Sequence, residues 1–214
     1  DKHKSILEMS KKFQLKKEDH YKLLKLCKKH KVNYACSAFD FDSLVFLDRK
    51  IKISFFKIPS GEINSTDMIN YISKSNKKIF LSTGMATFDE IANVLNKLKR
   101  YGNNKIVVMH CVSSYPAENK YINLNVIDEL KKRYKLEVGY SDHSIGHQAC
   151  LAAVAKGAVV VEKHVTTSRS LKGPDHKTSC TIDSFKNLVT KIREFEILLG
   201  SNSKIFSKNE IKIK

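Results

Sequence analysis

The chain has 214 residues, of which 42% are hydrophobic, so it can bury one substantial core, and an α/β chain of this length usually forms one domain. Its formal net charge is +17, but the lysines are spread over helix-like stretches without interleaved aromatic residues. This pattern argues against a nucleic-acid partner and favours a solvated surface that attracts anionic substrates.

No apolar run approaches the roughly 18 residues that a membrane span needs, so we expect no membrane partner. The number of cysteines is odd, and no CxxC pair occurs among Cys27, Cys36, Cys111, Cys150 and Cys180. This usage favours neither a disulfide framework nor a zinc ribbon, and it predicts a reducing compartment, the cytoplasm.

In chain order, the first predicted elements are helical. Residues 5–30 carry apolar side chains at three-to-four spacing in two segments. The apolar run Asn33–Phe39 predicts a short strand. Helical spacing resumes over 42–47, and Asp40 or Asp42 is expected to cap that helix at its N-terminus.

From Phe55 onward, apolar strand-like runs alternate with helical periodicity. Such alternation predicts βαβ units and a parallel sheet, with six strands when the run at 33–39 is included. The further predicted strands are 55–60, 78–83, 105–111, 136–140 and 158–164, and the helices between and after them are 67–73, 88–100, 124–134, 147–156 and 184–199.

A doubly wound open sheet and a (β/α)₈ barrel both agree with this order. No Gly-rich phosphate fingerprint follows the first strand, which weakens the dinucleotide-binding version. A barrel brings all carboxyl ends of its strands to one rim, so we favour a TIM-barrel type with about six of eight βα units in this chain. Polar residues gather at those ends: Ser37, Lys57, Ser60, Glu62, Ser82, Thr83, His110, Ser113, Tyr115, Ser141, Asp142, His143, Glu162, Lys163 and His164.

Two histidines at successive strand ends are candidates for a metal site. His143 follows the apolar run that begins at Val138, and His164 ends the next one. Imidazole nitrogens suit Mn, Fe and Zn. The alternative is two unrelated side chains, one capping a helix and one packed in a core.

Six motifs occur in register, each near a strand end. Together they resemble the N-acetylneuraminate (sialic acid) synthase family of nonulosonic acid synthases, from about Ser5 to Gly200. The motifs are Phe56-Lys-Ile-Pro-Ser-Gly-Glu62, Leu81-Ser-Thr-Gly-Met85, His110-Cys-Val-Ser-Ser-Tyr-Pro116, Gly139-Tyr-Ser-Asp-His143, Glu162-Lys-His164 and Gly173-Pro-Asp-His176.

The resemblance implies a barrel that condenses phosphoenolpyruvate with an N-acyl hexosamine, typically N-acetylmannosamine, to give N-acetylneuraminate or a related nonulosonic acid plus phosphate. It also implies a divalent metal, Mn²⁺ or Mg²⁺, held by the residues that match His143 and His164. Close variants use the precursor of legionaminic or pseudaminic acid. The stretch from Gly173 to Ser179 leans toward the sialic or legionaminic type.

The resemblance also assigns substrate contacts. Lys57 would supply the positive charge for phosphoenolpyruvate, while Tyr115 and Asp175 match sugar contacts and Glu62 matches an acid at the rim. Asp175 could instead be a turn residue, because Gly-Pro-Asp is common turn chemistry. Hydroxyls of the phosphoenolpyruvate pocket match Ser37, where the family more often has Thr, Ser60, Ser82, Ser113, where it often has Asn, and Ser141.

By the same resemblance, residues 1–200 are a partial barrel domain and 201–214 a linker toward an antifreeze-like domain, which in relatives reaches across a homodimer. Two further strands, carrying a glutamate and a lysine of the site, would precede these residues. We therefore expect the 214-residue chain by itself to have little activity. The alternative is a non-catalytic remnant or binding protein that keeps the synthase scaffold.

Overall fold

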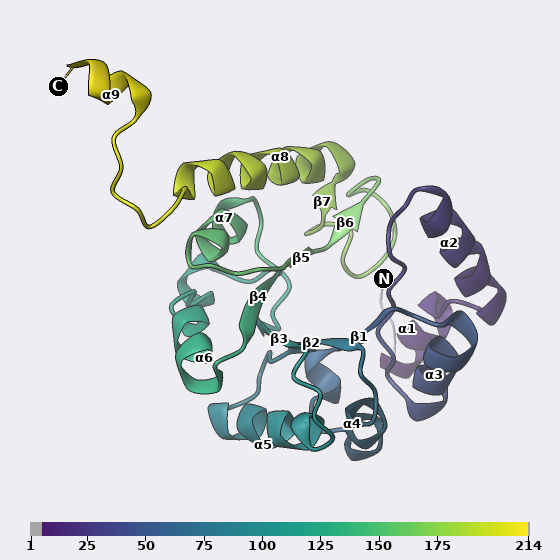
Figure 1. Ribbon diagram of the computed structural model, residues 1–214. Coiled ribbons are helices and arrows are strands. Elements are labelled where there is room, and N and C mark those ends of the chain that lie inside the picture. The colour runs from purple at the N-terminus through teal and green to yellow at the C-terminus, as the bar shows by residue number, and fades with distance from the viewer. Residues whose placement is uncertain (1–5, 214) are drawn as a thin grey trace.

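The computed structural model describes residues 6–213 and shows five parallel strands in the order β1-β2-β3-β4-β5. The strands curl into an arc at the centre of the molecule, and helices surround its outer side (Figure 1). The arc is a half-barrel, so the predicted parallel α/β architecture is confirmed. The strands are β1 (Phe55–Ile58), β2 (Lys78–Ser82), β3 (Ile106–Cys111), β4 (Glu137–Asp142) and β5 (Val161–Lys163).

The helices follow the predicted order closely, although the predicted start at residue 5 lies outside the described residues. Asp40 is the cap of α3, since its side chain accepts a 2.7 Å hydrogen bond from Ser43 N. The helices are α1 (Ile6–Phe13), α2 (Lys17–Lys29), α3 (Phe41–Phe46) continued by a π-helical turn (Leu47–Ile51), α4 (Thr66–Ser73), α5 (Phe88–Lys99), α6 (Val126–Tyr134), α7 (Gln148–Ala155), α8 (Ile182–Leu199) and α9 (Lys208–Ile213).

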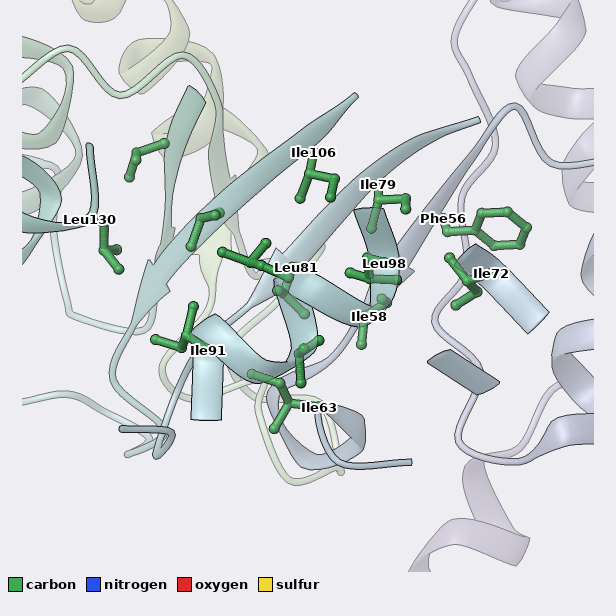
Figure 2. Close-up of a cluster of buried hydrophobic side chains, with 14 of the residues drawn as sticks. Phe56, Ile58, Ile63, Ile72, Ile79, Leu81, Ile91, Leu98, Ile106 and Leu130 are labelled. Carbon is green, nitrogen blue, oxygen red and sulfur yellow. The ribbon is translucent and has the colours of Figure 1, made fainter. Parts of the chain in front are cut away.

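The main core lies between the sheet and its outer helices. Alternate strand residues point to that side, as the pleat requires. Ile79 and Leu81 of β2 are fully buried there against Leu98 of α5, which Figure 2 shows among its neighbours. The other residues of each strand face the concave side, so Lys57 and Ser82 point away from this core.

One predicted strand is not formed, so the sheet has five strands and not six. Residues 33–38 have no regular structure and no ladder partner among the described residues. The apolar character of the run reflects packing against α2 and the core: Tyr34 OH lies 2.8 Å from His20 Nδ1, and Cys36 is half-buried. An apolar run can thus be satisfied without joining a sheet.

The C-terminal part also differs from expectation. The predicted strand 158–164 is shorter, and after it β6 (Val165–Thr166) pairs in parallel with β7 (Cys180–Thr181). The polar tail ends in α9, which lies apart from the rest of the protein (Figure 1). Over residues 6–213, none of the helices combines the length and apolarity that crossing a bilayer demands.

Candidate functional site

A lysine inside the half-barrel is held by residues from three other strands. Lys57 Nζ donates to Ser82 Oγ at 2.8 Å and lies 3.1 Å from Glu162 Oε1. Ser141 Oγ donates to the same carboxylate oxygen at 2.7 Å. The Lys57 side chain is only 13% exposed. The concave face therefore contains a shielded cation with hydroxyl groups around it, which is suited to bind an anion. We call these four residues the Lys57 cluster.

Two further predicted hydroxyls lie together, at a point where the backbone of Gly84 passes close to both serines. Ser60 Oγ and Ser113 Oγ are 3.2 Å apart. Gly84 has a φ of +38°, and a Cβ there would come within 2.4 Å of Ser60 Cβ and 2.6 Å of Ser113 Oγ. The backbone N–H of Gly84 donates to Cys111 Sγ at 3.1 Å. Only glycine fits this position without displacing the serine pair.

The two candidate metal-binding histidines lie side by side in an edge-to-face arrangement. His143 and His164 have ring centroids 5.4 Å apart and ring planes at 78°. His143 Nδ1 is 2.7 Å from the Val112 carbonyl, so this nitrogen carries the proton and Nε2 keeps its lone pair. Burial lowers the pKa of His143, and the neighbouring His164 lowers it further. A neutral imidazole with a free Nε2 fits the nitrogen part of a divalent-metal site.

Tyr115 and Asp175 border the histidine pair. The Tyr115 ring lies 4.2 Å from the His143 ring and 5.5 Å from the His164 ring, between centroids. Burial raises the pKa of Tyr115, and the nearby thiol and carboxylate groups raise it further, so the phenol stays protonated. Asp175 Oδ2 is 3.6 Å from His164 Nδ1. Within residues 6–213, no three His, Cys, Asp or Glu side chains are arranged to hold a metal ion.

Two predicted site residues are not brought into these groups. Glu62 accepts a hydrogen bond from Ser65, three residues on, at the start of α4. Ser37 lies in the irregular segment, where its carbonyl accepts a contact from Cys36 Sγ at 3.6 Å. Among the described residues, no hydrogen bond joins either side chain to the Lys57 cluster or the histidines.

The partner of Lys57, Glu162, was not among the predicted substrate contacts. Its position is set by register, because Glu162 of β5 lies opposite Ser141 of β4. The next pair along, Asp142 and Lys163, points to the other side of the sheet. Burial raises the pKa of Asp142, but hydrogen bonds from Lys163, Cys150 and Ser144 outweigh burial and leave this pKa low. Once the register of β4 and β5 is known, alternation along the strands places Glu162 on the side of Ser141 and Lys163 on the side of Asp142.

The fold and site define an α/β half-barrel protein with a shielded lysine among hydroxyl groups and a histidine pair at the carboxyl ends of its strands. The sequence matches the NeuB family over residues 1–204. The chain belongs to this family.

Three similarities locate the chain within the family. It is 41% identical over 210 residues to the N,N'-diacetyllegionaminic acid synthase of Campylobacter jejuni, covering 97% of this chain and 63% of that protein. It is 35% identical to the N-acetylneuraminate-9-phosphate synthase of Drosophila melanogaster, covering 91% and 51%. The sialic acid synthetase structure from Leptospira borgpetersenii has a TM-score of 0.92 at 30% identity, covering 99% of this chain and 74% of that one. The chain thus spans less than two thirds of the length of the Campylobacter and Drosophila proteins.

Proposed function

We propose that this chain carries the substrate-binding core of a synthase that condenses phosphoenolpyruvate with N-acetylmannosamine, or a related N-acyl hexosamine, to give a nonulosonic acid and phosphate. The observation that carries the proposal is the Lys57 ammonium among hydroxyls, at the same end of the sheet as the two imidazoles. Joining an anionic enol to an aldehyde calls for an anion site beside an electrophile-activating site.

Phosphoenolpyruvate brings a phosphate and a carboxylate, and the chain offers donors for both. Lys57 supplies the charge, and the other members of the Lys57 cluster include two hydroxyls, those of Ser82 and Ser141. The Ser60–Ser113 pair adds two more hydroxyls. Bonds from such groups to an anion are stronger than bonds between neutral partners.

A divalent cation, Mn²⁺ or Mg²⁺, would be held by His143 and His164, and when bound it would polarise the aldehyde oxygen of the sugar as a Lewis acid. The hydrogen bond from His143 Nδ1 to Val112 fixes the ring and leaves Nε2 for the ion. Imidazole ligands favour Mn²⁺ over Mg²⁺. Water or substrate oxygens would complete the coordination, as is usual where a catalytic site keeps open positions.

The proposed reaction forms one C–C bond, from carbon 3 of phosphoenolpyruvate to the aldehyde carbon. Water then adds at carbon 2, and phosphate leaves with cleavage of its C–O bond. The protonated phenol of Tyr115 can donate a hydrogen bond to the sugar. The carboxylate of Asp175, beside His164, can accept one from a sugar hydroxyl. These two groups would orient the aldehyde toward the enol.

Calorimetric titration with Mn²⁺ tests the metal part of the proposal. We expect His143→Ala and His164→Ala each to abolish Mn²⁺ binding, and His30→Ala, at the residue that caps the C-terminus of α2, to leave it unchanged. Binding that survives both substitutions would contradict the proposed site. The full-length protein should release phosphate from phosphoenolpyruvate only when the sugar and Mn²⁺ are present. A full-length protein that binds Mn²⁺ and phosphate without turnover would instead be a non-catalytic protein on the same scaffold.

A further inference from the structure

The charged residues directly before the two histidines form a buried ion pair. Asp142 ends β4 and Lys163 ends β5, and the two are partners in the parallel register. Lys163 Nζ lies 2.6 Å from Asp142 Oδ2, and the side chains are 2% and 0% exposed. Because each charged residue is covalently joined to a histidine, whatever fixes this pair also fixes where His143 and His164 leave the sheet.

The Asp142 carboxylate is fully satisfied. Oδ1 accepts from Tyr140 OH at 3.0 Å and from Ser144 N at 2.9 Å. Oδ2 accepts from Cys150 Sγ at 3.0 Å and from Lys163. Lys163 also donates to the Ser144 carbonyl, in the loop that follows His143. A buried network with every member bonded is rigid and holds its groups in one arrangement.

This network cannot touch a substrate bound at the Lys57 cluster. Ser141 and Glu162 point to the concave face, so the adjacent residues Asp142 and Lys163 point to the helix side, where Cys150 of α7 contacts them. A buried ion pair is also a poor source of stability, because apolar residues of similar volume are often as stable. Neither substrate contact nor stability therefore accounts for the pair.

We propose that Asp142 and Lys163 are positioning residues that set the separation and orientation of the His143 and His164 imidazoles. The network ties β4, β5 and the loop after His143 together at one point. Through it, the two rings are kept with their centroids 5.4 Å apart and in their edge-to-face arrangement before any ion arrives. The inference rests on the proposed metal-binding role of the histidines.

The test compares Mn²⁺ and inorganic phosphate binding by the 214-residue chain. We expect Lys163→Met to weaken Mn²⁺ binding by about 10- to 100-fold, the usual effect of removing a group that orients a metal ligand. Phosphate binding at Lys57 should change little, and Lys163→Arg should recover part of the Mn²⁺ affinity. Lys77→Met, which breaks an ion pair with Asp48 away from the site, is the matched control and should leave Mn²⁺ affinity unchanged.

If Lys163→Met does not fold, the double variant Asp142→Asn with Lys163→Met removes both charges and avoids an unpaired buried carboxylate. We expect it to fold and still to bind Mn²⁺ weakly. A folded variant with wild-type Mn²⁺ affinity would overturn the inference and leave the proposed function standing.

A second readout needs no metal. In ¹H–¹⁵N spectra, the His143 Nδ1–H that is bonded to Val112 should be protected in the wild type and should shift in the double variant. If the wild type binds no Mn²⁺, the metal part of the proposed function fails, and this signal still decides the positioning role. A signal that does not move in the double variant would count against it.

Discussion

Lys57 of β1 and Glu162 of β5 are joined by an ion pair with 3.1 Å between Nζ and Oε1, although β1 and β5 are the two outermost strands of the five-stranded sheet. A flat sheet would separate its outer strands by four strand spacings, roughly 19 Å. The pair therefore spans the hollow of the half-barrel. It also means that the Glu162 carboxylate is paired with the same ammonium group that we propose binds phosphoenolpyruvate.

Replacing Glu162 by Gln should therefore strengthen the binding of inorganic phosphate. Glu162 competes with the anion for Lys57, and its side chain is 42% exposed, so solvent screens the attraction. The loss of competition is worth about 1 kcal/mol, or about fivefold in Kd. Titration calorimetry at low ionic strength would measure it. Glu137→Gln, which breaks an exposed pair with Lys78 at the opposite ends of the strands, is the control. Weaker phosphate binding by the Glu162 variant would show that Glu162 supports the anion site.

Gly84→Ala should destabilise the protein by about 2 to 4 kcal/mol, because the left-handed backbone and the contacts with Ser60 and Ser113 both oppose a Cβ. Urea denaturation would show a lower midpoint at unchanged slope. Gly61 is the matched control, since a Cβ there meets nothing within 4 Å. Equal stability of the two alanine variants would contradict the close approach at Gly84.

Asp48 should make stability depend on pH in the acid range. Its carboxylate lies 2.6 Å from Lys77 Nζ and 2.6 Å from Tyr71 OH. Burial raises the pKa of Asp48, but the bonds from Lys77 and Tyr71 outweigh burial and hold this pKa below its ordinary value of 3.8. Since the folded pKa is the lower one, the stabilisation is complete above the unfolded pKa and is lost as the pH falls through the folded pKa.

The measurement is the difference in unfolding free energy between the wild type and Asp48→Asn. We expect roughly 1 to 3 kcal/mol near neutral pH, shrinking as the pH approaches about 3. Asp128→Asn, which breaks an exposed pair with Lys156, should show a small difference throughout. If the difference in unfolding free energy between the wild type and Asp48→Asn grew as the pH fell, the lowered pKa of Asp48 would be contradicted.

Leu81→Ala should cost about 2 to 5 kcal/mol, because Leu81 is fully buried between β2 and the outer helices (Figure 2). Ile197→Ala on α8 removes a similar side chain that is 80% exposed, so its effect should be small. Thermal or urea unfolding of the two variants would test whether the core lies on the helix side of the sheet. Similar losses of stability in both variants would contradict a core on the helix side of the sheet.

Much of the fold was predictable because buried parallel strands carry their own signal. The run Ile106–Cys111 is apolar almost throughout, and every residue of it is buried. The helix at 88–99 was predictable from the spacing of its apolar face, and it begins with a capping box between Thr87 and Glu90. The run at 33–39 was wrongly predicted as a strand because Tyr34 packs on His20, a contact that no local pattern encodes.

The residue types of the site were predictable, but not all of the hydrogen-bond and ion-pair partners of these residues. Placement at strand ends puts Lys57, Ser82 and Ser141 in one region whatever the details of the barrel. The choice of Glu162 as partner of Lys57 depends on sheet curvature, which sequence periodicity does not contain. The prediction that Glu62 lies at the rim did not include its local partner, the Ser65 hydroxyl three residues on, which donates a hydrogen bond to its carboxylate.

The short strand β5 alternates in charge, with Glu162 facing Lys57 and Lys163 facing Asp142. Each side of the sheet is thereby neutralised by one residue of opposite sign. A shift of β5 by one residue in one direction would bring Glu162 opposite the Asp142 carboxylate, and a shift in the other direction would bring Lys163 opposite Ser141, beside the Lys57 ammonium. Either shift would place like charges together in poor contact with water, at a cost that no apolar contact of a three-residue strand offsets. The alternating charges of β5 thus disfavour a shifted pairing with β4 during folding.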